Sequence, residues 1–285
     1  MSLPRFDYRA PKTIEEAVAL RHEFGDDALV MAGGLTAMIL LRERLVAPRV
    51  IVSLSEIPDL RRIDANGGLS VGAMVTHSEV ARSAAVRKTA LLLAEACGRV
   101  GSPAIRNMGT LGGNISHGDS ASDPAPALLA LNAEAIIAGP RGERRMPLAA
   151  FFRGTLTTAL DDDELLVALS VPPAAAGTRT RFLKYTATTA EAFATVTVAA
   201  SITCDGAGGC TAARIGLGSV APTPLRATAA EDILRGRKLS PEIIAEAAAA
   251  AAACTDPSSS GQGSAEYRRE MTGVWVRRVL EELAA

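Results

Sequence analysis

The alternation of apolar and polar positions divides the chain into helix-like and strand-like segments. Thr13 followed by Glu16 forms a capping-box pattern, and the apolar positions after it run to Gly25, which predicts an amphipathic helix. The elements expected next are a buried strand over 28–32, a helix over 37–45 and a strand over 49–54. A strand, a glycine turn, a helix and a strand make a βαβ unit, and the sheet of such a unit is parallel.

The middle of the chain mixes the two patterns. The turn Asn66-Gly67-Gly68 separates two short apolar runs, 60–65 and 69–72, and predicts a hairpin. Further elements are expected as helices over 76–82, 90–100 and 127–131 and as strands over 135–138 and 165–171. Residues 101–126 are rich in Gly, Ser, Asp and Pro, which predicts a long loop. Loops of this length in a compact domain are usually functional or disordered.

The pattern changes after Pro172–Gly177, a stretch typical of a linker. Strands are then expected over 181–184, 195–203 and 212–219, followed by helices over 227–236, 242–254 and 265–283. Three strands followed by helices predict a small α+β domain. The expected division is a βαβ subdomain over residues 1–55, a second subdomain over 56–177 and a C-terminal α+β domain over 178–285.

Composition narrows the class of protein. The 285 residues are 48% hydrophobic with a formal net charge of −1, which indicates a globular chain without a basic surface for nucleic acid. No apolar run is long enough for a membrane span and the first residues lack a signal-peptide core, so we expect a cytoplasmic protein. The cysteines form no CxxC pair and the histidines show no ligand spacing, so no metal site is expected. Cys204 and Cys210 flank a predicted turn, where a reduced pair is favoured over a disulfide.

The first candidate for chemistry is Ala32-Gly33-Gly34-Leu35-Thr36, the first glycine segment, which begins where a predicted strand ends. Glycine lacks a Cβ, so its backbone takes positive φ and its N–H groups can approach a diphosphate closely. Thr36 adds a hydroxyl donor. A glycine pair after a strand also serves as an ordinary tight turn, and on residue types alone that alternative is the stronger one.

The second glycine segment, Thr110-Leu111-Gly112-Gly113-Asn114, lies in the long predicted loop. Its residues follow neither a helix nor a strand period, so we do not expect core packing to explain it. It matches neither the P-loop pattern nor the GxGxxG dinucleotide fingerprint. The alternatives are a phosphate-binding loop and a loop whose glycines serve only the fold.

Two charged residues are candidates for contacts with a cofactor. Asp123 is suited to accept hydrogen bonds from sugar hydroxyls, and the alternative is that it caps the helix expected from Pro124. Lys184 ends an apolar strand, where a cation facing the glycine segments would stabilise a reduced flavin, although most lysines have no such role. No nucleophile elbow, zinc-protease motif or catalytic triad occurs, so no catalytic residue is assigned and the chemistry would come from a cofactor.

At these residues the sequence resembles the FAD-binding medium subunit of the molybdenum hydroxylases, the family that includes carbon monoxide dehydrogenase and xanthine dehydrogenase. The resemblance spans nearly the whole chain and rests on the two glycine segments, with Ser122–Leu128 at the family's spacing after them. Further matches are Phe6-Asp7-Tyr8, Gly216–Arg226 and Tyr267-Arg268-Arg269. The pair of glycine segments at this separation is far more specific than either segment alone.

The resemblance implies a PCMH-type FAD-binding fold, with two α/β subdomains and a C-terminal three-stranded antiparallel sheet with helices. The glycine segments would wrap the diphosphate and ribityl chain, Asp123 would hold ribityl or ribose hydroxyls, and Lys184 would lie beside the isoalloxazine. The full set of implied FAD contacts is Met31, Ala32, Gly33, Gly34, Leu35, Thr36, Val100, Thr110, Leu111, Gly112, Gly113, Asn114, Asp123, Leu166 and Lys184.

The resemblance also implies partners. A large subunit would carry a molybdenum-pterin cofactor and a small subunit would carry 2Fe-2S clusters, in a dimer of heterotrimers. FAD on this chain would take electrons from the clusters and pass them to an external acceptor. The alternatives are a stand-alone PCMH-fold flavin oxidoreductase and a structural subunit that has lost its cofactor.

Two departures from the family pattern concern the flavin. Leu35 stands where relatives commonly have His, Gln or Thr, which would remove one polar contact to FAD. Thr188-Thr189-Ala190-Glu191 occupies a segment that is usually written with basic residues and an Asp. We expect these departures to change how the reactive edge of the flavin is lined.

Overall fold

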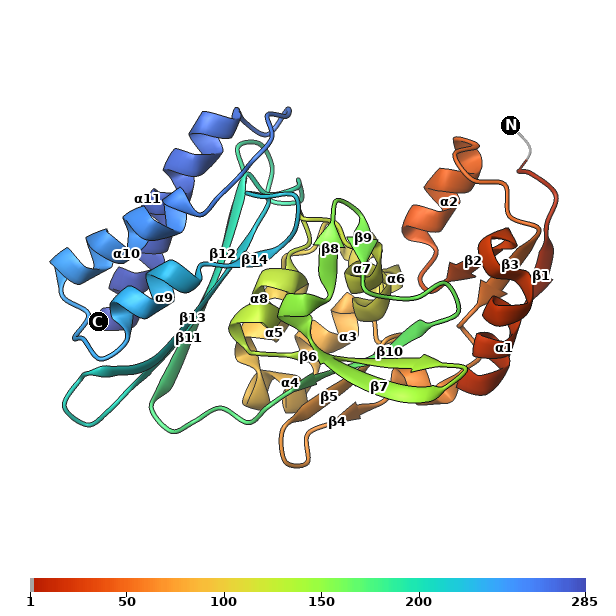
Figure 1. Cartoon of the computed structure of the whole chain (residues 1–285), viewed down its shortest axis with the longest axis horizontal. Helices are drawn as coiled ribbons and strands as arrows, with labels where there is room; N and C mark the ends of the chain where they lie inside the picture. The colour runs from red at the N-terminus through yellow and green to blue at the C-terminus, as the bar shows by residue number, and fades with distance from the viewer. Residues whose placement is uncertain (1–2) are drawn as a thin grey trace.

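The structure is a computed structural model that describes residues 3–285. Figure 1 shows three main sheets following one another along the long axis of the molecule, with the N-terminal sheet at one end and the C-terminal sheet and helices at the other. Within residues 3–285, no helix is long and apolar enough to cross a membrane.

The N-terminal sheet is parallel, as the βαβ pattern predicts. Its strand order is β1-β3-β2, and both pairings are parallel. The predicted cap of the first helix is present, because the Thr13 hydroxyl accepts a hydrogen bond from the Glu16 N–H at 3.2 Å. The elements are β1 (Asp7–Arg9), α1 (Ile14–Phe24), a 3-10 turn (Gly25–Asp27), β2 (Ala28–Met31), α2 (Leu35–Arg42) and β3 (Val50–Ser53). The strand β1 is an addition to the predicted unit.

The middle sheet is antiparallel, with strand order β4-β5-β10-β6-β7. The predicted hairpin is present as β4 and β5, and the strand expected over 165–171 is β10. The strands are β4 (Ile63–Asp64), β5 (Leu69–Gly72), β6 (Glu134–Gly139), β7 (Gly142–Pro147) and β10 (Leu165–Val171), with β8 (Phe152–Gly154) and β9 (Thr157–Thr158) forming a small separate pair. The helices are α3 (His77–Arg82), α4 (Ala84–Thr89), α5 (Leu91–Gly98), α6 (Pro103–Met108), α7 (Leu111–His117) and α8 (Pro124–Ala130), with 3-10 turns at Pro58–Arg61 and Leu148–Ala150.

The long loop predicted over 101–126 is wrong, because this stretch contains α6, α7 and the start of α8. Both extra helices begin with a side-chain cap: Ser102 accepts from the Ile105 N–H and Thr110 accepts from the Gly113 N–H. Core packing does contribute to the second glycine segment, contrary to expectation, since Leu111 is fully buried. The two helices are only six and seven residues long, too short to show a clear helical period in the sequence.

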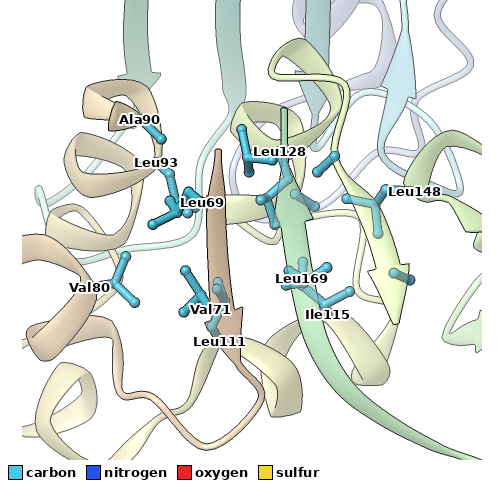
Figure 2. Packing of buried hydrophobic residues seen from close by; sticks show 14 of the residues in the cluster. Leu69, Val71, Val80, Ala90, Leu93, Leu111, Ile115, Leu128, Leu148 and Leu169 are labelled. Atoms are coloured by element: carbon cyan, nitrogen blue, oxygen red, sulfur yellow. The ribbon is translucent and has the colours of Figure 1, made fainter. Parts of the chain in front are cut away.

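The helices cover one face of the middle sheet and bury a single apolar cluster there. Figure 2 shows Leu111 and Ile115 of α7 beside Val71 on β5 and Leu169 on β10. The spacing of Leu111 and Ile115 is i, i+4, which places both on one face of a helix. This packing fixes the start of α7 against the sheet, and therefore fixes the second glycine segment.

The C-terminal domain is an antiparallel sheet covered by three helices, as the sequence pattern predicts. Its order is β11-β12-β13-β14, so a two-residue strand, β14, joins the three expected strands. The elements are β11 (Thr178–Tyr185), β12 (Val196–Cys204), β13 (Cys210–Gly218), β14 (Leu225–Arg226), α9 (Thr228–Leu234), α10 (Pro241–Ala253) and α11 (Ala265–Ala284). Cys204 and Cys210 face each other in register at the end of the β12–β13 hairpin as free thiols, which agrees with the expected reduced pair.

Candidate functional site

The first glycine segment connects β2 to α2 and places two backbones in direct contact. Gly34 is the N-cap of α2 with φ 77°, a left-handed conformation that favours glycine. A Cβ on Gly33 would lie 2.0 Å from the carbonyl oxygen of Met108, at the end of α6. Only glycine therefore permits the N-terminal sheet to approach the α6–α7 junction this closely.

The start of α2 offers unused hydrogen-bond donors. Within residues 3–285, none of the backbone N–H groups of residues 33–36 donates a hydrogen bond, and no side chain caps this helix. Helix N-termini with free N–H groups bind anions, because the donors and the helix dipole both favour negative charge. The Thr36 side chain is exposed beside them. This arrangement suits a diphosphate.

The second glycine segment differs, because the N–H groups of residues 111–114 are already satisfied. Leu111 N–H donates to the Val75 carbonyl and Gly112 N–H to the Ala73 carbonyl, both at 2.9 Å. The Gly113 and Asn114 N–H groups donate to the hydroxyl and the carbonyl of Thr110 at 3.1 and 3.0 Å. Its backbone therefore holds the fold, and what it can offer a ligand is side chains and a close approach.

The glycines of the second segment permit that close approach. A Cβ on Gly112 would lie 2.3 Å from the Cβ of Ala73, and one on Gly113 would lie 3.3 Å from the Cβ of Ala32. The two glycine segments are therefore neighbours, although they come from different sheets. The Asn114 side-chain oxygen accepts a hydrogen bond from the Ser122 hydroxyl, so the Asn114 amide is held in place with its nitrogen available as a donor.

Asp123 and Lys184 form a buried ion pair. The Lys184 ammonium donates to the Asp123 carboxylate at 2.7 Å and to the Arg99 carbonyl at 3.1 Å. The side chains are only 2% and 6% exposed, respectively, for Lys184 and Asp123. The pair joins the loop before α8 to β11 of the C-terminal domain. It also brings together the two charged residues that the sequence suggested separately.

Burial raises the pKa of Asp123 to about 6, although Lys184, Arg99 and the Thr197 hydroxyl each act to lower it. The second carboxylate oxygen of Asp123 and the hydroxyl of Thr197 are both buried and have no hydrogen-bond partner among the described residues. A buried acceptor without a donor is costly, and the donors that can satisfy this oxygen are the neighbouring Thr197 hydroxyl and a ligand hydroxyl. This orphaned oxygen and the free N–H groups of residues 33–36 both fit the FAD that the resemblance implies.

The other expected contact residues are placed as follows. Met31 ends β2, half-buried, and Leu35 packs with its Cδ1 within 3.3 Å of where a Gly109 Cβ would be. Val100 is half-buried, and its carbonyl accepts a hydrogen bond from Arg106 at 3.0 Å. Leu166 is 4% exposed and belongs to the core cluster of the middle sheet.

The helix-capping alternative for Asp123 is wrong. The Asp123 side chain makes no capping hydrogen bond to α8. The Ser122 hydroxyl does that work instead, accepting from the Ala125 N–H at 3.2 Å. Asp123 is thereby left for the ion pair with Lys184.

Comparisons with known proteins identify the family to which this chain belongs. Residues 4–174 match the model described as "FAD binding domain in molybdopterin dehydrogenase", and residues 181–283 match "CO dehydrogenase flavoprotein C-terminal domain". The carbon monoxide dehydrogenase medium chain of Hydrogenophaga pseudoflava is 36% identical over 278 residues, covering 97% of this chain and 96% of that protein. The nicotine 6-hydroxylase medium subunit of Paenarthrobacter nicotinovorans is 33% identical, covering 100% and 99%. Reconstituted CO dehydrogenase from Oligotropha carboxidovorans superposes with a TM-score of 0.95 at 35% identity, covering 100% of this chain and 99% of that one.

The chain belongs to the FAD-binding medium subunits of the molybdenum hydroxylases. It is a flavoprotein subunit of an oxidoreductase, and the expected PCMH-type fold is confirmed. Two residues of this medium subunit were missed in the sequence, Arg99, whose carbonyl holds Lys184, and Thr197. In the β11–β12 hairpin, Lys184 pairs with Thr197. The sequence predicts these two strands, so their register could have identified Thr197 as a neighbour of Lys184.

The two departures of this medium subunit from the family pattern, Leu35 and residues 188–191, differ in their burial and contacts. Leu35 packs against the α6–α7 junction, where an apolar side chain is well placed. Residues 188–191 form an exposed turn between β11 and β12. The described part of the chain contains no cluster of three or more His, Cys, Asp and Glu side chains suited to a metal.

Proposed function

We propose that this chain is the electron-transfer subunit of a molybdenum hydroxylase, holding non-covalent FAD between iron–sulfur clusters and an external acceptor. The observation that carries the proposal is the set of free N–H groups at residues 33–36, directly beside the second glycine segment. FAD, when bound, supplies a centre that accepts electrons singly and releases them in pairs. Every other task falls to the protein.

The described residues divide these tasks among them. The N–H groups of residues 33–36 bind the diphosphate, and the Thr110 and Asn114 side chains contact the ribityl chain. The free oxygen of Asp123 accepts a hydrogen bond from a ribityl or ribose hydroxyl, since it has no partner within residues 3–285. Lys184 is held by Asp123 and the Arg99 carbonyl at the edge of the isoalloxazine. Val100 and Leu166 contribute apolar contacts to the ring.

The names of the similar proteins suggest the partners of this chain. The similar proteins are named as medium chains and medium subunits, which implies larger and smaller companions. We assign the molybdenum-pterin cofactor to a large subunit and the 2Fe-2S clusters to a small one, in a cytoplasmic dimer of heterotrimers. We propose that the chain has three domains. Residues 1–55 and 56–177 form two FAD-binding subdomains, and residues 178–285 form a C-terminal domain that covers the FAD site.

The role is tested with the assembled enzyme purified from its source. FAD is removed from one sample and restored to half of that sample, and reduction of the iron–sulfur clusters by substrate is followed separately from reduction of an external acceptor dye. We expect the FAD-free enzyme to reduce its clusters at the normal rate but to reduce the dye at least tenfold more slowly, with recovery on adding FAD.

Unchanged dye reduction without FAD would show that electrons leave by another route. A purified chain that neither carries nor takes up a yellow flavin would contradict the binding site itself. Co-purification distinguishes the remaining alternatives, because a stand-alone flavin oxidoreductase would purify without molybdenum or iron.

A further inference from the structure

Two cysteines face each other at one end of the C-terminal sheet. Cys204 ends β12 and Cys210 begins β13, and the strand register places them directly opposite each other. Lys184 of the proposed FAD site pairs with Thr197 near the other end of β12, seven residues away from Cys204. At about 3.3 Å per residue, roughly 23 Å of strand separate the two places. The thiol pair is therefore not part of the site proposed for FAD.

The backbone hydrogen bonds of the two cysteines point away from each other. The Cys204 N–H donates to the Gly177 carbonyl at 3.4 Å. The Cys210 N–H donates to the Arg237 carbonyl at 2.9 Å, and the Cys210 carbonyl accepts from the Gly236 N–H at 2.7 Å. Opposed residues of an antiparallel pair that do not hydrogen-bond to each other have Cα atoms about 4.5 Å apart. That separation lies within the range of about 4.4–6.8 Å that a disulfide requires.

The two thiols also share one environment. Opposed residues of an antiparallel pair lie on the same face of the sheet. Cys210 belongs to the apolar cluster between the C-terminal sheet and its helices, and Cys204 packs against that cluster. Burial raises the pKa of the Cys210 thiol, and the nearby Cys204 raises it further. Both cysteines are free thiols, so the pair is reduced, adjacent and held on either side by backbone hydrogen bonds.

The two thiols differ in exposure, and this difference sets the order of their reactions. Cys204 is half-buried and adjoins the exposed turn over residues 205–208, whereas Cys210 is 0% exposed, so a small oxidant reaches Cys204 first. Hydrogen peroxide breaks its O–O bond on the Cys204 sulfur, which gives a sulfenic acid and one water. The Cys210 sulfur then attacks the Cys204 sulfur, so that the S–S bond forms, the S–O bond breaks and a second water leaves. The two thiols together lose two electrons and two protons, which reduce the peroxide to water.

We propose that Cys204 and Cys210 form a reversible oxidation site, which hydrogen peroxide converts to a disulfide and a thiol reductant restores. The disulfide closes a short loop across the β12–β13 turn, and closing a loop removes conformations from the unfolded chain. The same hairpin is hydrogen-bonded through Cys210 to the connection between α9 and α10. Oxidation therefore locks this end of the C-terminal domain. The proposal does not depend on the electron-transfer role.

The site is tested on the FAD-loaded chain, which is exposed to a small excess of hydrogen peroxide and then denatured while free thiols are blocked with iodoacetamide. Mass spectrometry should show the peptide that contains Cys204 and Cys210 lighter by two hydrogens and unblocked. Cleavage at Asp205, the only acidic residue between the cysteines, should leave two fragments that stay joined until dithiothreitol is added. Both cysteines blocked by iodoacetamide, or fragments that separate without dithiothreitol, would overturn the proposal.

Three variants assign the reaction to this pair. Cys254→Ser removes an exposed thiol outside the pair and should form the cross-link to the same extent as the wild type. Cys204→Ser should not form it. In Cys210→Ala the Cys204 sulfenic acid has no thiol to attack it, so it should accumulate and react with dimedone. If Cys210→Ala does not fold, Cys204→Ser decides alone, and an undiminished loss of two hydrogens in that variant refutes the site.

A thermal measurement tests the lock. The oxidised wild-type chain should unfold at a temperature about 4 °C higher than the reduced chain, because the disulfide restricts the unfolded chain. Dithiothreitol should abolish this difference, and Cys204→Ser should show none after treatment with peroxide. An equal or lower unfolding temperature of the oxidised wild-type chain would overturn the lock.

Discussion

The two glycine segments of this chain look alike in sequence and differ in their hydrogen bonding. The first, residues 32–36, leaves the N–H groups of residues 33–36 without a partner among the described residues. In the second, residues 110–114, the N–H groups of residues 111–114 are bonded to Ala73, Val75 and Thr110. One segment is thus suited to receive an anion, and the other fastens a helix to the middle sheet.

The comparison teaches that glycine can serve either closeness to a ligand or closeness to the protein itself. Gly112 lies where a Cβ would be 2.3 Å from the Ala73 Cβ, so its small size is needed by the core. Gly33 lies where a Cβ would be 2.0 Å from the Met108 carbonyl oxygen, so its small size is needed to join the two segments. Substitutions at these positions should therefore affect different properties.

The largest expected effect on stability is that of Gly112→Val. The added side chain has no room beside Ala73, and overpacking of this kind costs about 3 kcal/mol of unfolding free energy. Chemical denaturation measures the loss. Gly206→Val is the control, because a Cβ there meets nothing within 4 Å, and its cost should stay below about 0.5 kcal/mol. Equal effects of the two variants would show that the second segment is not a packing element.

Gly33→Ala should act mainly on the flavin. The new methyl group forces the first segment away from the α6–α7 junction, and we expect FAD to bind about a hundredfold more weakly, a loss of about 2.7 kcal/mol. Fluorescence titration of FAD gives the affinity, and circular dichroism checks that the fold remains. Gly261→Ala, with nothing within 4 Å of its Cβ, is the matched control. Normal FAD affinity in Gly33→Ala would show that close contact between the two glycine segments is not needed for FAD binding.

A pair of threonine variants sharpens the contrast. Thr110→Val removes the cap of α7 and should cost about 1 kcal/mol of unfolding free energy, and it should also weaken FAD because the Thr110 hydroxyl is assigned to the ribityl chain. Thr36→Val alters an exposed side chain, so stability should not change, whereas FAD should bind about fivefold more weakly through loss of one hydrogen bond. Thermal unfolding and FAD titration of both variants decide this. Loss of stability in Thr36→Val, or unchanged stability in Thr110→Val, would contradict the comparison.

The smallest expected effect is that of pH. Backbone N–H groups do not titrate, so the contribution of the first segment to FAD affinity is constant. Burial raises the pKa of Asp123 to about 6, and its charged form accepts hydrogen bonds more strongly. We therefore expect FAD affinity to fall about threefold as the pH drops from 8 to 5. A flat profile would exclude Asp123 from contact with FAD.

In the FAD-free chain, the raised pKa of Asp123 also predicts how stability depends on pH. Between the ordinary carboxyl pKa and about 6, the folded chain keeps a proton on Asp123 that the unfolded chain has released. The contribution of Asp123 to the free energy of unfolding therefore falls as the pH rises through this window. Denaturation at several pH values tests this, and the double variant Asp123→Asn, Lys184→Met, which removes both charges, should lose that dependence.

Much of the fold could be predicted because its elements have strong local patterns. The capping box at Thr13 and Glu16 marks the start of the first helix. The apolar periods of the strand over 165–171 and of the C-terminal strands and helices are long enough to be recognised in the sequence. The helices α6 and α7 could not be predicted, since both are short and α7 contains two glycines of low helical propensity. They form because caps and contacts with the middle sheet support them.

The candidate site was predictable as a set of residues but not as a set of bonds. The family pattern pointed to Asp123 and Lys184 separately, and only the structure joins them at 2.7 Å across 61 positions of sequence. In the same way, the N–H groups of Leu111 and Gly112 donate to the carbonyls of Val75 and Ala73, which lie far away in the sequence. No local pattern records which carbonyl a distant N–H will meet.

The ion pair between Asp123 and Lys184 has a consequence for the order of events during synthesis of this chain. Lys184 is the last residue of the proposed FAD site to leave the ribosome, and it lies beyond residues 4–174, which match the FAD-binding model. A nascent chain that ends before Lys184 can bury Asp123 only as a lone carboxylate or in its protonated form, and an unpaired buried charge costs several kcal/mol. We therefore expect the flavin pocket to close only after the C-terminal domain has been made, which would make cofactor loading a late step of biogenesis.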